Sequence, residues 1–126
     1  MFRANSLILY VDDVDLSTAC YRDILKADPF ETYQDFSVFA LNDDFVVGLQ
    51  SKHAIDPKPQ RSFGGFELSF SNATKEDVDR LHAAWTAKGV EMVLEPTTLE
   101  FGYTFVAADP DGHRLRVCAT DTTNVA

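Results

Sequence analysis

Three of the charged side chains on predicted strands could bind a ligand or help to hold an ion. Arg114 and Arg116 occupy alternate positions near the end of the chain, and Glu67 begins the run Glu67-Leu-Ser-Phe-Ser71. Alternate side chains of a strand face the same way, so the two arginines share one face. Glu67 and Arg116 could form a structural salt bridge or bind polar groups of a ligand, and the sequence leaves both interpretations open.

The residue types that usually carry catalysis are scattered along the chain. His53 lies in a loop, His82 on a predicted helix and His113 in a predicted turn. The chain has no GxSxG nucleophile motif and no glycine-rich phosphate loop. Asp109-Pro-Asp-Gly112 is typical of a turn rather than of a calcium loop. We therefore assign no catalytic residue.

Aromatic side chains are a second resource for binding, because the chain has ten Phe, four Tyr and one Trp. Tyr10 lies on the face of its strand opposite to the apolar positions, where its ring and hydroxyl could contact a ligand. Phe101, Tyr103 and Phe105 alternate on a later strand, and we expect Tyr103 and Phe105 to reach a cavity or its rim. The sequence does not decide which of the three face the cavity and which belong to the core. Phe36 and Phe39 face opposite sides of their strand, and the sequence does not decide which one faces the cavity.

A pattern of elements that occurs twice must position these residues. Each copy starts with a strand of alternating apolar residues, continues with a helix and then adds two or three strands. In the first copy the strands are expected at 6–11, 30–33, 36–41 and 45–50, with the helix after Asp12-Asp13. In the second copy they are expected at 67–71, 90–94, 103–107 and 114–119, with the helix after Thr74.

The pattern predicts an α+β fold of tandem βαβββ modules in a single domain, 1–126. Module one is expected at 5–51 and module two at 66–120. The linker at 52–65 contains prolines and glycines, which break regular structure.

Composition limits the partners and the compartment. The chain has 20 acidic and 11 basic residues and a formal charge of −9, which repels nucleic acid and anionic membranes. Residues 1–10 show neither a secretory signal nor a membrane span, so we expect a cytoplasmic protein. Cys20 and Cys118 lack CxxC spacing and are expected to be buried thiols.

The repeat, together with Tyr10-Val-Asp-Asp-Val14, Tyr21-Arg-Asp-Ile-Leu25 and Asp109-Pro-Asp-Gly-His-Arg-Leu115, resembles the vicinal oxygen chelate superfamily of glyoxalases, bleomycin-resistance proteins and extradiol dioxygenases. Trp85 and Gly112-His-Arg-Leu-Arg-Val-Cys118 look most like its phenazine-resistance branch. The resemblance implies that the modules form a curved mixed sheet around a cavity. It also implies a homodimer.

Metal-dependent members of the superfamily hold a divalent cation with His, Gln or Glu on the inner face of the sheet. The corresponding positions here look like Ser6, Gly48, Glu67 and Arg116. Only Glu67 is a competent ligand, because glycine has no side chain and a guanidinium repels a cation. We therefore expect no metal ion and no other cofactor.

Strand parity gives the side chains that are expected to face the cavity and bind a ligand. They are Ser6, Ile8, Tyr10, Gly48, Gln50, Glu67, Ser69, Tyr103, Phe105, Arg114, Arg116 and Cys118.

Three functions compete at this stage. The leading hypothesis is a metal-free binding protein, not an enzyme, that sequesters a planar aromatic antibiotic or toxin. The second is a glyoxalase-like lyase or dioxygenase that uses a divalent cation. The third is a structural dimer without a small ligand, whose own side chains fill the hollow.

Overall fold

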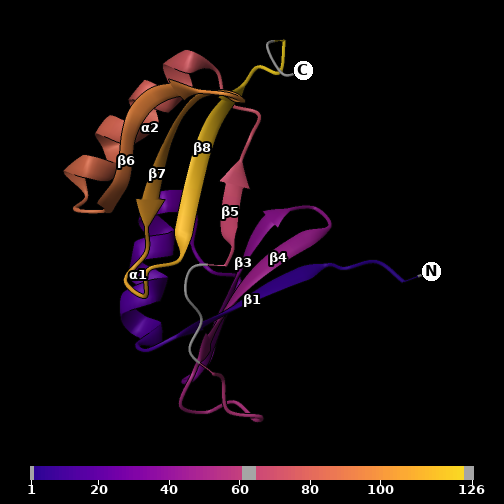
Figure 1. Cartoon of the computed structure of the whole chain (residues 1–126). Helices are drawn as coiled ribbons and strands as arrows, with labels where there is room; N and C mark the ends of the chain where they lie inside the picture. Colours follow the sequence, from indigo (N-terminus) through magenta and orange to yellow (C-terminus); the bar gives the residue numbers. More distant parts are fainter. Residues whose placement is uncertain (1, 61–64, 124–126) are drawn as a thin grey trace. The chain divides into compact units, whose positions relative to one another are not determined.

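The chain divides into two compact units, Met1–Arg61 and Ser62–Ala126, in a computed structural model that describes residues 2–60 and 65–123. Within the described residues each unit has one α-helix and one four-stranded sheet (Figure 1). The predicted α+β fold of two βαβββ modules is confirmed, and the units are called the first and the second module below. Part of the predicted linker, 61–64, lies outside the described residues. The assignment of 1–126 to one domain stays a prediction.

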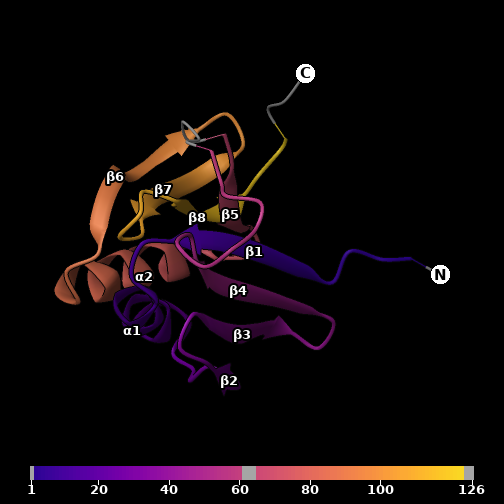
Figure 2. The ribbon, with the colours of Figure 1, turned by 90° about the horizontal axis from the view of Figure 1, so that it is seen from below.

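The first module has the sheet order β1-β4-β3-β2, in which β1 and β4 are parallel and the other pairs are antiparallel (Figure 2). Its elements are β1 (Ser6–Val11), α1 (Val14–Leu25), β2 (Glu31–Thr32), β3 (Phe36–Asn42) and β4 (Phe45–Ser51).

Local signals determine where α1 begins and ends. The Asp13 side chain accepts a hydrogen bond from the Leu16 amide at 3.1 Å and caps the first turn. Lys26 has φ 51°, a left-handed conformation that ends the helix. The buried hydroxyls of Thr18 and Ser37 are hydrogen-bonded at 2.8 Å and join α1 to β3.

The core of the first module lies between α1 and one face of its sheet. Tyr21 of α1 and Phe39 of β3 are fully buried, and their ring centroids lie 6.4 Å apart. Buried aliphatic residues complete this layer: Leu9, Val11, Val47 and Leu49. Phe39 therefore belongs to the core, which leaves the opposite face of β3 to Phe36.

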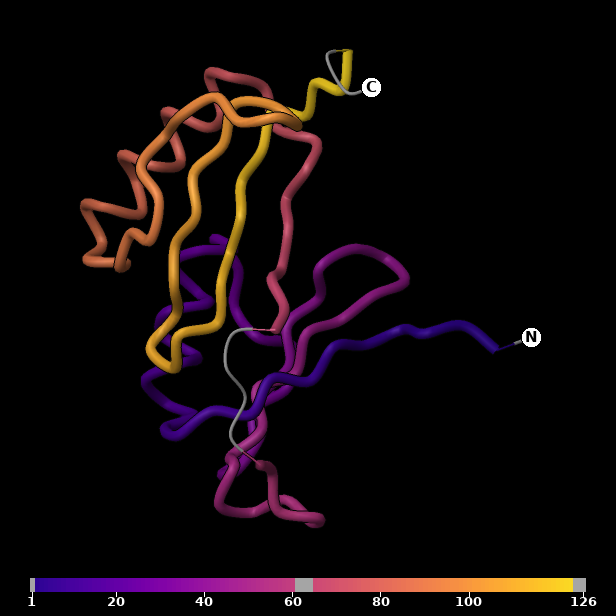
Figure 3. Tube along the Cα trace, viewed as in Figure 1, coloured from indigo at the N-terminus to yellow at the C-terminus, as the bar shows by residue number. Residues whose placement is uncertain are grey.

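The second module has the sheet order β5-β8-β7-β6, in which β5 and β8 are parallel. Its elements are β5 (Glu67–Phe70), α2 (Lys75–Ala87), β6 (Glu91–Leu99), β7 (Gly102–Ala108) and β8 (Arg114–Thr120). The chain path through the hairpins that join β6, β7 and β8 can be followed in Figure 3. Neither described helix of the protein is long and apolar enough to cross a membrane.

A capping box starts α2. The Asp77 amide donates to Thr74 Oγ1 and the Thr74 amide donates to Asp77 Oδ2, both at 3.0 Å. Trp85 packs its buried ring edge-on against Phe70 and Phe105, with centroid distances of 6.2 and 5.3 Å. The core of the second module thus lies between α2 and one face of its sheet.

The orientation expected for Tyr103 and Phe105 is wrong, because both side chains face α2. Phe105 is fully buried, and its ring centroid lies 5.5 Å from that of His82 in addition to its contact with Trp85. The Tyr103 hydroxyl donates to Asp79 Oδ1 at 2.6 Å. Almost every residue of β7 is buried, so the strand lacks the polar alternation that distinguishes its two faces.

Candidate functional site

The first sheet turns one face toward α1 and leaves a second face with aromatic and small residues. Tyr10, Gln50 and Phe36 lie beside one another on β1, β4 and β3. Ile8 is paired with Gly48 in the next row with the same parity. We call this set, Ile8, Tyr10, Phe36, Gly48 and Gln50, the aromatic face.

Gly48 lets two of these side chains lie close over the backbone. A Cβ atom at position 48 would lie 2.7 Å from Phe36 Cζ and 2.8 Å from Ile8 Cδ1, closer than real contacts allow. The ends of both side chains therefore occupy the space that any other residue at position 48 would fill. Phe36 therefore lies on the aromatic face and Phe39 in the core, whereas a cavity on the side of Phe36 stays a prediction.

The aromatic face exposes apolar surface together with two polar groups, the Tyr10 hydroxyl and the Gln50 amide. Ile8 is 42% exposed and Tyr10 is 44% exposed, whereas Phe36 and Gln50 are half-buried. The Gln50 amide donates through Nε2 to the Ser51 carbonyl at 3.0 Å, which fixes its orientation. A flat ring that contacts this face would cover apolar carbon and meet the Gln50 amide. Ser6 is exposed on the same strand with the same parity.

The second sheet leaves a very different face on the side away from α2. Leu115 and Val117 of β8 are fully buried on the helix side, so Arg114 and Arg116 lie on the other side. Register places Glu67 opposite Arg114 and Ser69 opposite Arg116. We call Glu67, Ser69, Thr104, Arg114 and Arg116 the basic face.

Arg116 is held in place by two neighbours. Its Nε donates to Glu67 Oε1 at 2.6 Å, and its Nη1 donates a long bond to Thr104 Oγ1 at 3.4 Å. The Thr104 hydroxyl itself donates to the Val117 carbonyl at 2.7 Å, so its oxygen is oriented as an acceptor. The salt bridge between Glu67 and Arg116, one of two interpretations that the sequence left open, is present. It does not exclude ligand binding, because both side chains keep about a quarter to a third of their surface exposed, 26% for Arg116 and 34% for Glu67.

Two further predicted site residues lie near these arginines. Ser69 Oγ and Ser71 Oγ are hydrogen-bonded to each other at 2.7 Å. Cys118 is buried as expected, whereas Cys20, which was also expected to be buried, is only half-buried. Cys118 is paired in register with Thr104, and its Sγ lies 3.9 Å from the Phe101 carbonyl.

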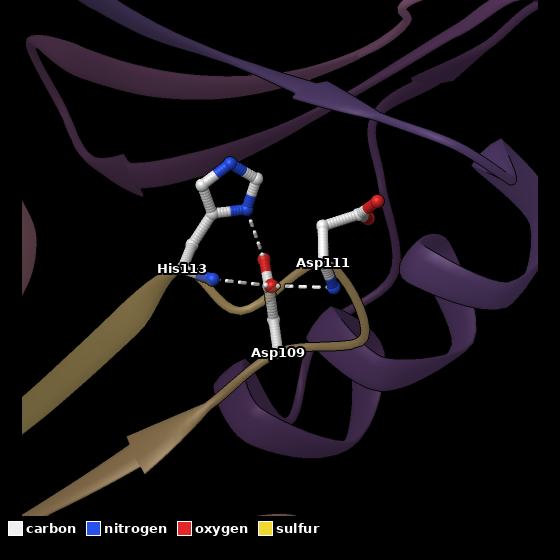
Figure 4. Close-up of side chains that lie close together, drawn as sticks. All are labelled: Asp109, Asp111 and His113. Carbon is white, nitrogen blue, oxygen red and sulfur yellow. Dashed lines mark hydrogen bonds and ion pairs between the residues drawn. The ribbon is translucent and has the colours of Figure 1, made fainter. Parts of the chain in front are cut away.

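The Asp109-Pro-Asp-Gly112 segment forms a turn closed by its own first side chain (Figure 4). Asp109 Oδ1 accepts from the amides of Asp111 and His113 at 2.9 Å, and Asp109 Oδ2 lies 2.7 Å from His113 Nδ1. This hydrogen bond raises the pKa of His113 above its usual value. Donor atoms of Asp109, Asp111 and His113 lie within 4.8 Å of one another. Both oxygens of Asp109 are already engaged, so the cluster is explained by closure of the turn.

A separate depression of about 330 Å³ lies at the start of α1 in the first module. His53 Nε2 lies 2.8 Å from Asp12 Oδ1, and hydrogen bonds from His53 and Lys52 lower the pKa of Asp12. The lining is mainly polar and acidic and therefore suits an apolar ring poorly: Asp12, Asp13, Val14, Asp15, Gln34, Asp35, Ser51 and His53.

The four positions that correspond to metal ligands in the superfamily do not fit a divalent cation. Gly48 has no donor atom, and Phe36 and Ile8 occupy the space above it. Arg116 is a permanent cation, and it already binds Glu67, the one carboxylate of the four. Ser6 offers only a weak hydroxyl ligand. The chain's own residues therefore provide no set of ligands there.

The structure confirms the strand parity of most predicted site residues but not that of all. Ile8, Tyr10, Gly48 and Gln50 lie on one face of the first sheet, and Glu67, Ser69, Arg114 and Arg116 on one face of the second. Sequence reasoning missed Thr104, whose small polar side chain gave no signal inside an apolar strand. Binding of a ligand by these residues stays a prediction.

Comparison with known proteins connects the chain to a family. Residues 3–117 match the family described as Glyoxalase/Bleomycin resistance protein/Dioxygenase superfamily. The chain is 34% identical over 122 residues to the phenazine antibiotic resistance protein EhpR of Enterobacter agglomerans. The aligned region covers 93% of this chain and 92% of that protein.

Solved structures show the same fold. The solution NMR structure of protein ATC0852 from Agrobacterium tumefaciens is 45% identical with a TM-score of 0.85, over 96% of this chain and 99% of that one. The crystal structure of a glyoxalase-related enzyme from Fulvimarina pelagi has a TM-score of 0.80 at 17% identity, over 94% of this chain and 88% of that one. At 17% identity, the similarity to the Fulvimarina pelagi enzyme concerns the fold alone.

Proposed function

The chain belongs to the Glyoxalase/Bleomycin resistance protein/Dioxygenase superfamily, and we propose that within it the protein binds a planar aromatic small molecule without a metal ion. Its role would be to sequester an aromatic antibiotic or toxin rather than to convert it. The similarity to a phenazine antibiotic resistance protein over most of the chain supports a role of this kind.

The aromatic face is the observation that carries the proposal. Ile8 and Tyr10 are each more than two-fifths exposed on a strand whose other side is packed in the core. The end of the Phe36 ring lies over Gly48, where a Cβ atom would come within 2.7 Å of it. Exposed aromatic and aliphatic surface with one fixed amide is what a flat apolar ring with a few polar atoms requires.

Metal-free binding is supported by the residues at the positions that hold the cation in metal-dependent relatives. Two of the four, Gly48 and Arg116, contribute no ligand, and the carboxylate of Glu67 is paired with the guanidinium. A lyase or dioxygenase that depends on a divalent cation would need at least some of these groups.

Isothermal titration calorimetry with phenazine and with its fully saturated analogue tests the proposal. We expect binding of the planar compound only, since the saturated rings cannot stack on Tyr10 and Phe36. Tyr10→Leu should weaken binding, whereas Tyr33→Leu, which removes a 60% exposed tyrosine elsewhere in the first module, should not. Calorimetry is preferable to tryptophan fluorescence because Trp85 is only 3% exposed and lies in the core.

Elemental analysis of protein purified without chelator tests the metal-free part separately. We expect far less than one nickel, zinc, iron or manganese ion per chain. A stoichiometric metal that is lost in Glu67→Gln would contradict the proposal and favour a metal-dependent enzyme.

We also propose that the protein is a homodimer, as its family resemblance implies. Sedimentation equilibrium at micromolar concentration measures this directly.

A further inference from the structure

Gln50 lies in the middle of the aromatic face. Register pairs it with Tyr10 of β1 on one side and with Phe36 of β3 on the other, and neighbouring strands lie about 4.8 Å apart. The Gln50 side chain is half-buried. The three residues form one row within the first module, so a flat ring that covers Tyr10 and Phe36 also covers the Gln50 amide.

One hydrogen bond shows which end of the Gln50 amide carries the nitrogen. A carbonyl oxygen only accepts, so the atom that lies 3.0 Å from the Ser51 carbonyl oxygen is Nε2. The oxygen Oε1 stands at the other end of the amide. It accepts no hydrogen bond from the residues that the structure describes. The donor end of the amide is thus anchored, and the acceptor end has no partner among those residues.

Oε1 is the atom of the aromatic face whose needs distinguish one ligand from another. The Tyr10 hydroxyl both donates and accepts, so it adapts to either kind of polar group. Nε2 keeps a second hydrogen, but its first already has a partner, whereas both lone pairs of Oε1 are unused. A ligand that covers Oε1 without supplying a donor removes the hydrogen bond of this oxygen to water and replaces it with nothing.

We propose that Gln50 is the specificity-determining residue of the aromatic face and that its Oε1 accepts a hydrogen bond from an N–H or O–H group at the edge of the ligand's ring. The inference rests on the proposed function and adds the chemical class of the ligand. An amino or hydroxyl group on the ring meets Oε1 with a donor. An ether or an unsubstituted ring edge covers Oε1 without one.

The test compares three probes that share one ring system: 2-aminophenazine, 2-methoxyphenazine and phenazine. The amino group donates, the methoxy group only accepts, and phenazine has no substituent. Calorimetry on the wild-type protein should show 2-aminophenazine binding about tenfold more tightly than 2-methoxyphenazine, the usual effect of about one hydrogen bond. Equal affinities, or tighter binding of the methoxy compound, would overturn the inference while leaving the proposed function intact. Absence of binding by all three probes would overturn both.

Variants identify the residue responsible. Gln50→Met keeps the length of the side chain and removes the amide, so the amino and methoxy compounds should bind equally while phenazine still binds. Gln34→Met is the matched control, since it makes the same change at an exposed glutamine that lines the separate depression at the start of α1. A preference that survives in Gln50→Met, or that is lost to the same extent in Gln34→Met, would overturn the assignment to Gln50.

NMR spectroscopy of the wild-type protein keeps the test decisive if Gln50→Met does not fold. A hydrogen bond to Oε1 moves the resonance of the side-chain carbonyl carbon, Cδ, of Gln50 downfield. This resonance should therefore shift further downfield with 2-aminophenazine than with 2-methoxyphenazine or phenazine, which share its ring system. An equal shift with all three probes would show that Oε1 receives no donor from the amino group and would overturn the inference.

Discussion

The absence of a side chain at Gly48 shapes the aromatic face. Gly48 has an ordinary backbone conformation, so its importance lies in the contacts that a Cβ atom would make and not in backbone strain. Those contacts are with the ends of Phe36 and Ile8, two side chains that can move. A small residue at position 48 would therefore be tolerated by the fold but would displace the surface that we propose for binding.

We predict that Gly48→Ala changes the free energy of unfolding by no more than about 1 kcal/mol, because the lost freedom of glycine in the unfolded chain offsets part of the displacement. Affinity for phenazine should fall about tenfold, the usual effect of a misplaced apolar contact in a pocket. Chemical denaturation and calorimetry measure the two quantities. Gly65→Ala is the control, since its Cβ would meet nothing within 4 Å. Unchanged affinity in Gly48→Ala would remove Phe36 from the binding surface.

The hydrogen bond between His113 and Asp109 should make the free energy of unfolding depend on pH. Its hydrogen bond to Asp109 raises the pKa of the imidazole in the folded state. A raised pKa means that the stabilisation is fully present below the unfolded value of about 6.5 and is lost as pH rises through the folded value. The free-energy cost of His113→Gln should thus be larger at low pH than at high pH, by about 1 kcal/mol. Denaturation of both proteins across this range measures the difference.

An NMR titration provides an independent check on the same residue. The ring of His113 should titrate with a midpoint above the ordinary value of histidine. A midpoint at or below that value would contradict the charge-assisted bond to Asp109.

At the scale of the elements, the start of α2 is set by reciprocal bonds between Thr74 and Asp77. We predict that Thr74→Ala lowers the free energy of unfolding by about 1 kcal/mol, the usual effect of losing an N-cap hydroxyl. Thr74→Ser should keep most of the stability, since serine retains the acceptor. Denaturant unfolding of the three proteins measures this. Equal stability of the alanine variant would show that tertiary packing alone fixes the start of the helix.

The same cap should also make the stability of the protein depend on pH. Hydrogen bonds from the Thr74 backbone, the Arg80 side chain and the Thr74 hydroxyl lower the pKa of Asp77. The stabilisation by this carboxylate is present above its unfolded pKa and is lost as pH falls through the folded value. The difference between wild type and Asp77→Asn should accordingly disappear in acid.

Elements whose two faces differ in polarity could be predicted from the sequence. Arg114-Leu-Arg-Val117 alternates strictly, and its charged side chains lie away from α2 as expected. Thr74 and Asp77 stand at the helix start that their types indicate. The strand β7 could not be oriented in this way, because nearly all of its residues are buried and its two faces differ little in polarity, and the face expected for Phe105 is therefore wrong.

The candidate site could be predicted only in part for a related reason. Parity assigned Tyr10 and Gln50 to one face, but it could not show that Phe36 lies over Gly48, a contact between strands that depends on register. It also left open whether Glu67 pairs with Arg116, because a single sequence does not give the distance between two strands. Contacts between side chains of different strands therefore could not be predicted from the sequence.

At the scale of the whole molecule, the proposed homodimer has to overcome the charge of its own chains. Each chain carries a formal charge of −9, so two copies repel each other over distances that salt screens. Apolar contacts are not weakened by moderate salt in this way. If apolar surface holds the dimer, its dissociation constant should fall as the concentration of sodium chloride rises from about 20 mM to about 300 mM, where the screening length becomes shorter than 10 Å.

Sedimentation equilibrium at several protein concentrations measures this constant, and thermal unfolding provides a second readout, because the midpoint of a dimer rises with protein concentration. Association that weakens as salt rises would mean that pairs of opposite charge hold the two chains, since screening acts on attraction as it does on repulsion. A monomer at every salt concentration would contradict the proposed dimer. It would leave the aromatic and basic faces, each defined within one module of one chain, as the surfaces on which ligand binding has to be explained.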